Sequence, residues 1–360
     1  MSKIAILGNL EMGLLLFRRE IIEGLVREGH QVYAVSPEDG YTAQLEELGC
    51  KVCHVNLSRH GMNPLSELKL MMAYVKLFKK LKPDMVFSFS IKPNLYGGMA
   101  CRLLKIPCVP NITGLGVALQ NDTTVRKVLL AGYKVALKKS PVVFFQNSAN
   151  LNFFREKGIV KDNFILLPGS GVNLQRNCFE EYPEDDGVTS FLFLGRIMRD
   201  KGVREYIEAS KLIKEKYPHT RFLMVGELEK DYAEEFERLD AQSFVELYEK
   251  TDDPHSFITR ADAVVVPSYH EGMSNVSLEA AAAGRPIISS RIHGCMEVVD
   301  DGVNGFSFTV KDEKALAQAM EKFIELPHSA KEQMGKEGRK KVEREFDRQR
   351  VVDEYIKIAR

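Results

Sequence analysis

Long apolar runs are missing from this 360-residue sequence: none approaches the ~20 residues that a membrane-spanning helix needs. Residues 1–8 enter a strand-like run at once, without the apolar core and cleavage site of a secretory signal. Cysteine is scarce, and the CxxC spacing of Cys50 and Cys53 has no second pair to complete a zinc site. We therefore expect a cytoplasmic protein without a metal site.

Net charge is also missing, because 50 Lys and Arg balance 50 Asp and Glu. The balance hides an asymmetry: residues 1–140 carry 19 basic against 11 acidic side chains, and the remainder carries 31 against 39. A basic first half indicates an anionic partner. No nucleic-acid recognition motif is present, so we expect no nucleic-acid partner. An anionic membrane surface and a diphosphate substrate both fit.

Strand-like and helix-like segments alternate along the chain. An apolar run at 3–8 precedes a helical pattern that ends at Gly29, and the strand-like run 31–36 follows. This rhythm predicts an α/β protein with doubly wound parallel sheets, whose ligands bind at the carboxyl ends of the strands. Gly13 is expected in the first loop at that edge. The rhythm stops in the polar stretch 174–190 and then restarts, which indicates two domains.

Two segments of the basic half, 65–82 and 125–139, pair an apolar stripe with a row of cations. The first stripe consists of Leu65, Leu68, Met72, Val75 and Phe78. The second consists of Val125, Val128, Leu129, Tyr133 and Val135. Such helices either pack on a sheet with their lysines in solvent or lie on a membrane interface. The pattern alone leaves both interpretations open.

The most informative stretch lies between Val264 and Gly284. Three valines are followed by a small-residue loop, 271–275, and by a helix-forming segment. A helix start preceded by small residues offers unpaired N–H groups and a positive dipole end, which suit a phosphate. Glu271 and Glu279 flank this cradle, as expected for a ligand that is a phosphorylated sugar or nucleotide. An ordinary strand-to-helix turn with solvated glutamates is the alternative.

Two cations follow strand ends in the second half of the chain. Arg196 comes after the strand-like run that begins near Ser190, and Lys201 lies in the loop beyond it. A forked guanidinium and an ammonium would neutralise the charge that develops on a diphosphate leaving group. Each of them taken singly is equally well explained as a surface cation.

Taken together, these residues resemble the retaining glycosyltransferases of family 4. The resemblance rests on an ordered set of motifs: Gly195-Arg196, Lys201-Gly202, Glu271-Gly272, Glu279 and Asp301-Gly302-Val303-Asn304-Gly305-Phe306. The seven-residue spacing between Glu271 and Glu279 is its specific part. The first half is similar to bacterial transferases that add N-acetylgalactosamine or related sugars to polyprenyl-diphosphate-linked saccharides. That similarity is carried by FRREIIEGLVREGHQV, SRHGMNP, SFSIKPNLYGG and ITGLG.

The resemblance implies a GT-B architecture of two Rossmann-like domains facing across a cleft. Their expected bounds are 1–172 and 173–344, with a final helix at 345–360 that crosses back to the first domain. It also implies retaining transfer of a hexose or N-acetylhexosamine from a UDP-sugar to a polyprenyl-diphosphate-linked saccharide. No metal or other cofactor is implied. The place of action would be the inner face of the cell membrane, where the protein would be peripheral.

The same resemblance assigns site residues. Arg196 and Lys201 would hold the donor diphosphate and Glu271 the donor sugar, as the catalytic set. The donor-binding set is Gly13, Gly195, Glu249, Thr251, Gly272, Met273, Ser274, Asn275 and Glu279, with Glu279 on the ribose. The acceptor-binding set is Arg59, Asn63, Lys92 and Asn94, for which plain loop structure is the alternative.

Three positions depart from the wider family. Gly13 stands alone where many members have two adjacent glycines, and Glu249 replaces a common glycine. The stretch 111–114 stands where many members place a histidine near the donor sugar. Two other functions remain open at this point: a nucleotide-sugar 2-epimerase of the same architecture, and a non-catalytic nucleotide-sugar-binding subunit. The sequence leaves the sugar and the acceptor hydroxyl unassigned.

Overall fold

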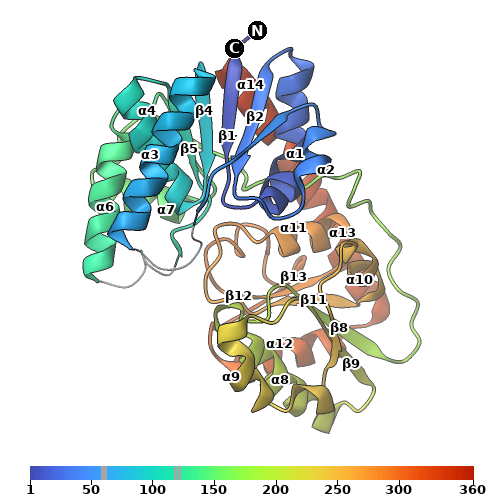
Figure 1. Ribbon diagram of the computed structural model, residues 1–360. Helices are drawn as coiled ribbons and strands as arrows, with labels where there is room; N and C mark the ends of the chain where they lie inside the picture. The colour runs from blue at the N-terminus through green and yellow to red at the C-terminus, as the bar shows by residue number, and fades with distance from the viewer. Residues whose placement is uncertain (58–62, 117–118, 120–122) are drawn as a thin grey trace. The chain divides into compact units, whose positions relative to one another are not determined.

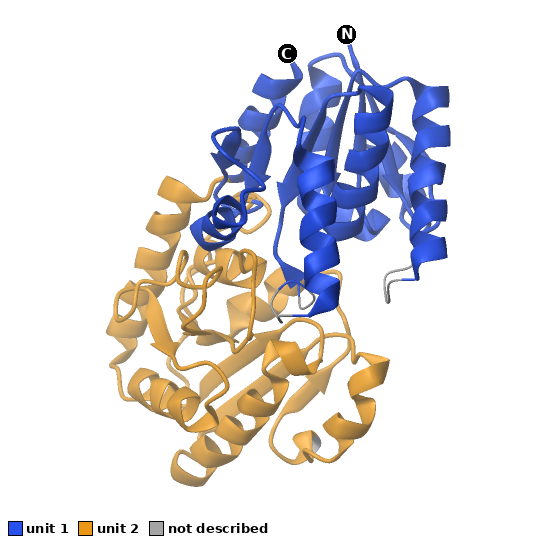
Figure 2. Cartoon of the chain, turned by 90° about the vertical axis from the view of Figure 1, so that its left-hand side faces the viewer, with its two compact units in different colours: residues 1–170, 348–360 blue, residues 171–347 orange. Residues whose placement is uncertain are grey.

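The computed structural model describes residues 1–57, 63–116, 119 and 123–360. The chain forms two compact units, which Figure 2 shows in different colours. Unit 1 comprises residues 1–170 and 348–360, and unit 2 comprises residues 171–347. Each unit is built around one sheet.

The sheet of unit 1 has the strand order β3-β2-β1-β4-β5-β6-β7, and every adjacent pair is parallel. Its strands are β1 (Lys3–Leu7), β2 (Gln31–Ser36), β3 (Lys51–His54), β4 (Met85–Phe89), β5 (Cys108–Ile112), β6 (Val143–Phe145) and β7 (Phe164–Leu166). The helical segments are α1 (Glu11–Arg27), α2 (Thr42–Glu46), α3 (Pro64–Leu81), the π-helical turn η1 (Pro93–Gly97), α4 (Gly98–Leu104), α6 (Thr124–Leu137), α7 (Ser148–Glu156) and α14 (Arg348–Ala359).

Both faces of this sheet are covered by helices (Figure 1). Side chains alternate across a strand, so Ile4 and Ile6 of β1 pack with α1 and α14, whereas Ala5 and Leu7 pack with α3 and α4. All four are fully buried. This two-sided burial explains why β1 is apolar throughout, and it confirms the predicted doubly wound parallel sheet.

The last helix of the chain, α14, belongs to unit 1 and packs on α1. Tyr355 is fully buried, and its ring meets those of Phe87, Phe89 and Phe144. Its hydroxyl accepts a hydrogen bond from Asn111 at 2.8 Å. Asn111 opens the stretch that replaces the histidine of many relatives, and here its amide fastens the C-terminal helix to the sheet.

The sheet of unit 2 has the order β10-β9-β8-β11-β12-β13, again with parallel pairs throughout. Its strands are β8 (Thr189–Leu194), β9 (Thr220–Val225), β10 (Glu246–Tyr248), β11 (Ala263–Val266), β12 (Ile287–Ser290) and β13 (Gly305–Phe308). The helical segments are η2 (Arg199–Lys201), α8 (Val203–Lys216), η3 (Lys230–Tyr232), α9 (Ala233–Glu237), η4 (Ala241–Ser243), α10 (Pro254–Arg260), α11 (Asn275–Ala282), α12 (Glu313–Ile324) and α13 (His328–Glu345).

Unit 2 is also covered on both faces of its sheet. Phe191 and Phe193 of β8 belong to the core that includes α8 and α12. Leu192, between them, belongs to the opposite core, which includes α11 and α13. The small residues 280–283 of α11 and the turn after it are fully buried, which lets α11 lie close to α13.

One sequence-based expectation is wrong in detail, and one open alternative is resolved in part. Helix α1 begins at Glu11, so Gly13 lies in the first turn of a helix and not in the loop before it. The apolar stripe of α3, for which sheet packing and a membrane interface were both open, is divided: Val75 and Phe78 are buried, whereas Leu65, Leu68 and Met72 are exposed. The buried face of α3 runs instead through Leu70, Tyr74, Val75 and Phe78.

Within the part of the chain that the structure describes, no helix combines the length and apolarity that a membrane crossing requires.

Candidate functional site

The site in unit 2 begins with Gly202, which brings the ends of two neighbouring strands together. Strands β8 and β11 are adjacent and parallel, so the loops after them emerge at one edge. A Cβ atom on Gly202 would lie 2.1 Å from the carbonyl oxygen of Pro267, and its φ of +69° also favours glycine. The amide of Tyr269 donates to the carbonyl of Asp200 at 2.9 Å. The two loops are therefore in direct backbone contact.

This contact places Lys201 beside Glu271. The Lys201 ammonium forms an ion pair with Oε1 of Glu271, and the Ser268 hydroxyl donates to the same oxygen at 2.8 Å. The side chains of Lys201 and Glu271 are 26% and 17% exposed, so both remain reachable from solvent. The structure thus brings together two of the three residues expected in the catalytic set.

The N-terminus of α11 follows directly. Ser274 caps the helix, and its side chain accepts from the amide of Ser277 at 3.2 Å. The amide of Ser274 donates to the carbonyl of Gly294 at 2.7 Å, so it is already used within the fold. The amides of the first turn, which begins at Asn275, have no acceptor inside the helix. They provide the positive end expected of a phosphate cradle.

Glycine is required on the far side of this loop as well. Gly294 has a φ of +88°, and a Cβ atom there would lie 2.7 Å from the carbonyl oxygen of Glu271. Met273 is 6% exposed and belongs to the core that includes α11, whereas Gly272 and Glu279 are half-buried. Because Glu279 is four residues after Asn275, the two share one face of α11.

The loop that carries Glu271 also contains a histidine, His270, just before it. His270 is exposed, and the partial desolvation of its ring lowers its pKa most, with Lys311 adding to the effect. Asp200 and Glu271 oppose the shift without reversing it. The imidazole of His270 is therefore neutral near pH 7 and adds no positive charge beside the Lys201–Glu271 pair.

Arg196 points to a different partner. Its guanidinium contacts Glu229 at 2.8 Å, with the two side chains 50% and 33% exposed. An ion pair this exposed contributes at most about 1 kcal/mol, so an incoming anion can displace Glu229 at little cost. Gly195, just before Arg196, has a φ of +151°. Its carbonyl oxygen lies close to Gly226, where a Cβ atom would be only 1.8 Å away.

The loop expected to border a nucleotide base lies between β10 and α10. Glu249 is exposed, and the hydroxyl of Thr251 accepts from the amide of Asp253 at 3.0 Å. Asp253 in turn caps α10 by accepting from the amide of Ser256. The loop is therefore ordered by local hydrogen bonds at its α10 end.

In unit 1, a buried carboxylate at the start of α1 organises the segment after β2. Glu11 is fully buried and accepts from the amides of Asp39 and Tyr41 and from the Thr42 hydroxyl, at 3.0, 2.9 and 2.6 Å. The Nε2 atom of His54 lies 2.9 Å from Oε1 of Glu11. Burial alone would raise the pKa of Glu11, but these hydrogen bonds outweigh it and lower the pKa to about 2. Gly13, two residues on, is partly exposed and has no close neighbour that forbids a Cβ atom.

The four residues expected to bind an acceptor differ in their structural surroundings. Arg59 lies outside the described residues. Asn63 caps α3 by accepting from the amide of Leu65, and Lys92 pairs with Glu67 at 2.6 Å. Asn94 is 1% exposed, and its side chain bonds Ser88 and the carbonyl of Asn111 within unit 1. Those contacts give Asn94 a structural role, so it is not part of the site proposed below.

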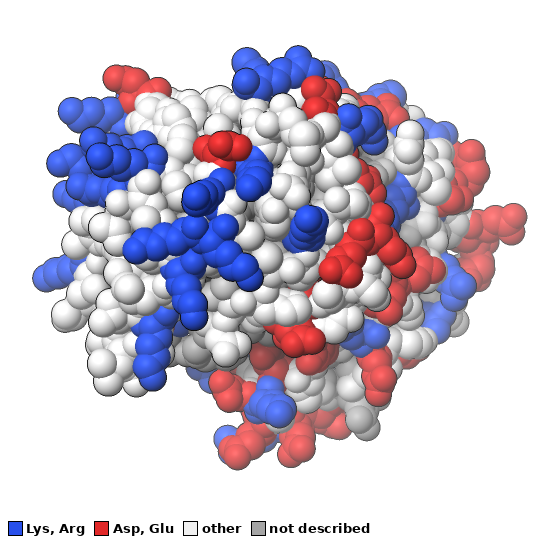
Figure 3. Space-filling view, turned by 45° about the horizontal axis from the view of Figure 1, so that its top comes forward, with Lys and Arg blue, Asp and Glu red and all other residues white. Residues whose placement is uncertain are grey.

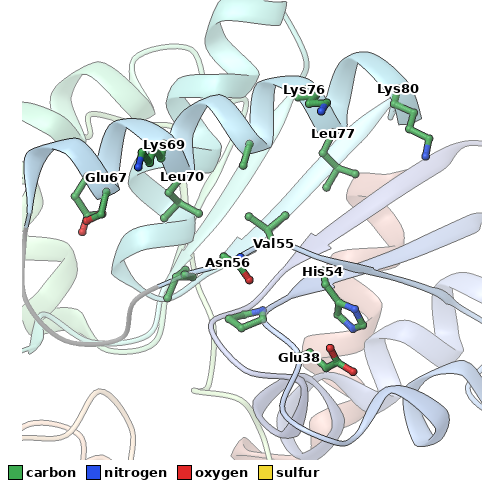
Figure 4. A pocket seen from close by; sticks show the side chains of 14 residues that line it. Glu38, His54, Val55, Asn56, Glu67, Lys69, Leu70, Lys76, Leu77 and Lys80 are labelled. Carbon is green, nitrogen blue, oxygen red and sulfur yellow. The ribbon is translucent and has the colours of Figure 1, made fainter.

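A groove of about 1020 Å³ runs along α3 in unit 1. Figure 4 shows Lys69, Lys76 and Lys80 along its helix side, with Val55 and Asn56 after β3 on the other side. The apolar part of the lining is Val55, Leu57, Leu70, Ala73 and Leu77. The groove therefore combines an apolar floor with a row of exposed lysines.

Two helices of unit 1, one of them the helix that lines this groove, expose apolar side chains among cations. On α3 these are Leu65, Leu68 and Met72, and on α6 they are Val125, Val128 and Val135. In Figure 3, Lys and Arg side chains gather on the side of unit 1 that carries α3, α4 and α6. Soluble proteins normally scatter such apolar residues, and a concentration of them among cations is typical of an interfacial surface.

Two family models match the chain. Residues 175–341 match Glycosyl transferases group 1, and residues 3–147 match Glycosyl transferase 4-like. The chain thus combines a glycosyl transferase 4-like domain with a group 1 glycosyl transferase domain. It is therefore a glycosyltransferase enzyme, a result that argues against both the epimerase and the non-catalytic subunit.

Curated relatives and solved structures agree with this family. The glycosyltransferase is 28% identical over 341 residues to the N,N'-diacetylbacillosaminyl-diphospho-undecaprenol α-1,3-N-acetylgalactosaminyltransferase of Campylobacter jejuni, covering 90% of this chain and 89% of that one. It is 29% identical over 348 residues to the capsular polysaccharide biosynthesis glycosyltransferase CapM of Staphylococcus aureus, covering 92% and 90%. The structure of Anabaena HepE in complex with UDP-glucose superposes with a TM-score of 0.83 at 18% identity, covering 100% and 99%. The fold is that of the GT-B glycosyltransferases.

Sequence reasoning missed two residues that shape this glycosyltransferase's site. Ser268 orients Glu271 by a hydrogen bond, and Gly294 leaves room for the backbone of Glu271. Ser268 lies in the Pro-Ser break after β11, so its position beside the acidic loop was the available signal. Gly294 has no such signal, because its need for glycine comes from a backbone contact 23 residues away in the chain.

Proposed function

We propose that this glycosyltransferase moves a hexose or N-acetylhexosamine from a UDP-sugar to a polyprenyl-diphosphate-linked saccharide, with retention of the anomeric configuration. The observation that carries the proposal is the Lys201–Glu271 pair at the start of α11. A cation for the leaving phosphate and a carboxylate for the sugar stand side by side, next to a helix N-terminus.

The donor would bind by exchanging this ion pair. Lys201 and Arg196 would turn from Glu271 and Glu229 to the diphosphate oxygens, which accept hydrogen bonds from both kinds of cation. The carboxylate of Glu271 would then be released to accept from donor-sugar hydroxyls. Glu279, on the same face of α11 as Asn275, would accept from the ribose.

Charge neutralisation would come from the chain itself. As the bond between the anomeric carbon and the phosphate breaks, negative charge develops on UDP, and Lys201, Arg196 and the first turn of α11 would stabilise it. We propose that the acceptor hydroxyl attacks from the face that UDP leaves and passes its proton to the departing phosphate. No metal ion is needed in this scheme.

The substrates are proposed from the relatives' names and from the surface of unit 1. The HepE structure contains UDP-glucose, and the Campylobacter jejuni enzyme is named for a diphospho-undecaprenol-linked acceptor. The groove along α3 suits such an acceptor, because its lysines match a diphosphate and its apolar floor matches a lipid chain. Asn63 caps this helix, and Lys92 contacts Glu67 at the groove.

Localisation at the inner face of the cell membrane is part of the same proposal. The exposed apolar residues of α3 and α6 would enter the interface, and the neighbouring lysines would contact anionic headgroups. Each such lysine contributes about 1 kcal/mol near a negatively charged surface.

A nucleotide panel tests the donor class. Thermal unfolding is measured with UDP, GDP and ADP, and then with UDP-sugars. A ligand at ~100 times its dissociation constant adds roughly 2.7 kcal/mol of stability. A UDP-selective shift supports the proposal, and transfer to an undecaprenyl-diphosphate-linked saccharide, with the product linkage read by NMR, completes it. Selectivity for another nucleotide, or a β-linked product from an α-linked donor, contradicts it.

A flotation assay tests the membrane face. The double variant Lys76→Glu/Lys80→Glu is compared with Lys314→Glu/Lys322→Glu, which changes net charge equally but on exposed positions of α12 in unit 2. We expect the first variant to lose most of its binding to vesicles that contain anionic lipid and the second to lose little. Equal loss in both would mean that overall charge, and not this surface, drives binding.

A further inference from the structure

Three ligand-type side chains of unit 2 converge, none of them among the residues assigned to the donor site. They are Cys178 and Glu180, from the segment before β8, and His255, from the first turn of α10. One atom from each, namely Sγ, a carboxylate oxygen and a ring nitrogen, lies within 4.8 Å of the other two. We propose that these residues form a zinc site.

The distances match zinc coordination. Cys178 Sγ lies 3.2 Å from Glu180 Oε1 and 3.6 Å from His255 Nε2, and these last two atoms are 3.8 Å apart. The circle through the three atoms has a radius of about 2 Å, and Zn²⁺ bonds to S, N and O ligands are 2.0–2.3 Å long. A zinc ion slightly out of their plane therefore reaches all three without rearrangement. A water completes the tetrahedron.

The donor chemistry also selects zinc. A thiolate, an imidazole and a carboxylate are its usual ligands, whereas Mg²⁺ and Ca²⁺ take oxygen donors. The thiolate and the carboxylate together balance the two charges of the ion. His255 directs Nε2 at the cluster, and its Nδ1 is buried without a hydrogen-bond partner, so the polar contacts of this ring lie on the cluster side. On binding, zinc displaces the thiol proton that Cys178 donates to Glu180.

The Cys178 and Glu180 side chains are exposed, but the surrounding structure fixes the backbone of Glu180 before any ion binds. Arg285 is 1% exposed and donates to the carbonyl of Glu180 at 3.0 Å. The amide of Glu180 donates to the carbonyl of Ala283. Arg339, the nearby cation, is engaged with the carbonyls of Asn177 and Ala282 and with Glu343. A preorganised set of ligands loses little conformational entropy on metal binding.

Bound zinc would cross-link two segments of unit 2. Cys178 and His255 are 77 residues apart in the sequence, so the link restricts a long loop of the unfolded chain and stabilises the folded one. It also anchors the start of α10, just after the loop at Glu249 and Thr251. The zinc site shares no residue with the donor site, so it stands or fails independently of the proposed function.

Cobalt is the probe for the test, because Co²⁺ bound to a thiolate gives a ligand-to-metal charge-transfer band that Zn²⁺ abolishes by competition. The full chain is stripped with a chelator, reduced and titrated with Co²⁺ and then with Zn²⁺. Cys178→Ser and His255→Ala remove one ligand each. Cys53→Ser is the matched control, because it removes another thiol that is not fully buried but lies in unit 1.

We expect one Co²⁺ per chain in the parent protein and in Cys53→Ser. We expect no charge-transfer band in Cys178→Ser, and a Zn²⁺ affinity at least about a hundredfold weaker in both ligand variants. Zn²⁺ should raise the unfolding temperature of the parent by several degrees and leave Cys178→Ser unchanged. Absence of the band in the parent protein, or its persistence in Cys178→Ser, overturns the proposal. The thermal scans without metal show whether each variant is folded.

Discussion

Lys201 and Glu271 are 70 residues apart in the sequence and form an ion pair in unit 2. The pair exists because Gly202 lets its loop touch the backbone at Pro267 and because Ser268 holds the same carboxylate oxygen. In this pair, the cation proposed for the leaving phosphate neutralises the carboxylate proposed for the sugar. A donor that breaks this ion pair therefore finds the cation and the carboxylate already side by side.

Lys201→Ala and Glu271→Ala are each expected to lower kcat by about a hundredfold or more, the usual effect of losing one charge-stabilising contact. Steady-state kinetics at saturating UDP-sugar measures the loss. Ser268→Ala, which leaves the ion pair intact but removes its orienting hydroxyl, should cost much less. Near-normal turnover in both alanine variants would remove the pair from the site.

Removal of either partner also leaves a partly buried charge without its counterion, so the alanine variants should unfold more readily. The double variant Lys201→Ala/Glu271→Ala should recover part of this stability without regaining activity. Urea unfolding of the three variants separates the two effects. If activity returned with stability, the kinetic loss would be a folding defect.

Arg196→Ala is expected to raise the KM for the UDP-sugar by about tenfold, because one charged hydrogen bond to phosphate contributes roughly 1.5–3 kcal/mol. Arg199→Ala is the matched control, since Arg199 is also an exposed arginine paired with a glutamate, Glu235. Its KM should change less than twofold. Equal effects in the two variants would indicate a general charge effect and not a phosphate contact.

Gly202→Ala is expected to destabilise unit 2 by more than about 3 kcal/mol, because the added methyl group would overlap the carbonyl of Pro267. Gly187→Ala separates overlap from backbone strain: its φ is +78°, but open space surrounds the site. Strain alone should cost about 1–2 kcal/mol. Chemical denaturation gives both values, and similar losses would show that the approach of the two loops is not tight.

Glu11 predicts a loss of stability in acid. Its pKa is lowered from 4.5 to about 2 in the folded chain, so the folded state binds fewer protons than the unfolded one between these values. The contribution is fully present above pH 4.5, amounts to at most about 3 kcal/mol, and disappears as the pH falls toward 2. Urea unfolding at pH 7 and pH 3 measures it.

The comparison for this prediction is Glu11→Gln, which keeps the shape of the side chain but cannot titrate. The variant should be less stable at pH 7 and should lose less stability than the parent between pH 7 and pH 3. Glu47→Gln, at an exposed position, should follow the parent at both values. An unchanged pH dependence in Glu11→Gln would show that other carboxylates govern acid unfolding.

Much of the fold could be predicted because its signals are local. Runs such as Ile4–Leu7 are apolar on both faces, and only a sheet covered on both sides buries them. Helix α3 shows where this reasoning fails. Leu65, Leu68 and Met72 continue the apolar stripe that Val75 and Phe78 begin, yet only the last two reach the core. Periodicity identifies an apolar face, but the face that α3 buries is rotated toward Leu70 and Tyr74, and only the packing of the unit decides that rotation.

The sequence by itself determined the strand–helix alternation, the spacing of Glu271 and Glu279 around the start of α11, and the kinds of charge available for a diphosphate, because these depend on residues close in the chain. Only the tertiary structure decided that Lys201 meets Glu271 while Arg196 meets Glu229, and that Cys178, Glu180 and His255 converge. Contacts of this kind depend on which strands are neighbours and on how closely their loops approach. Those distances follow from the packing of the whole unit.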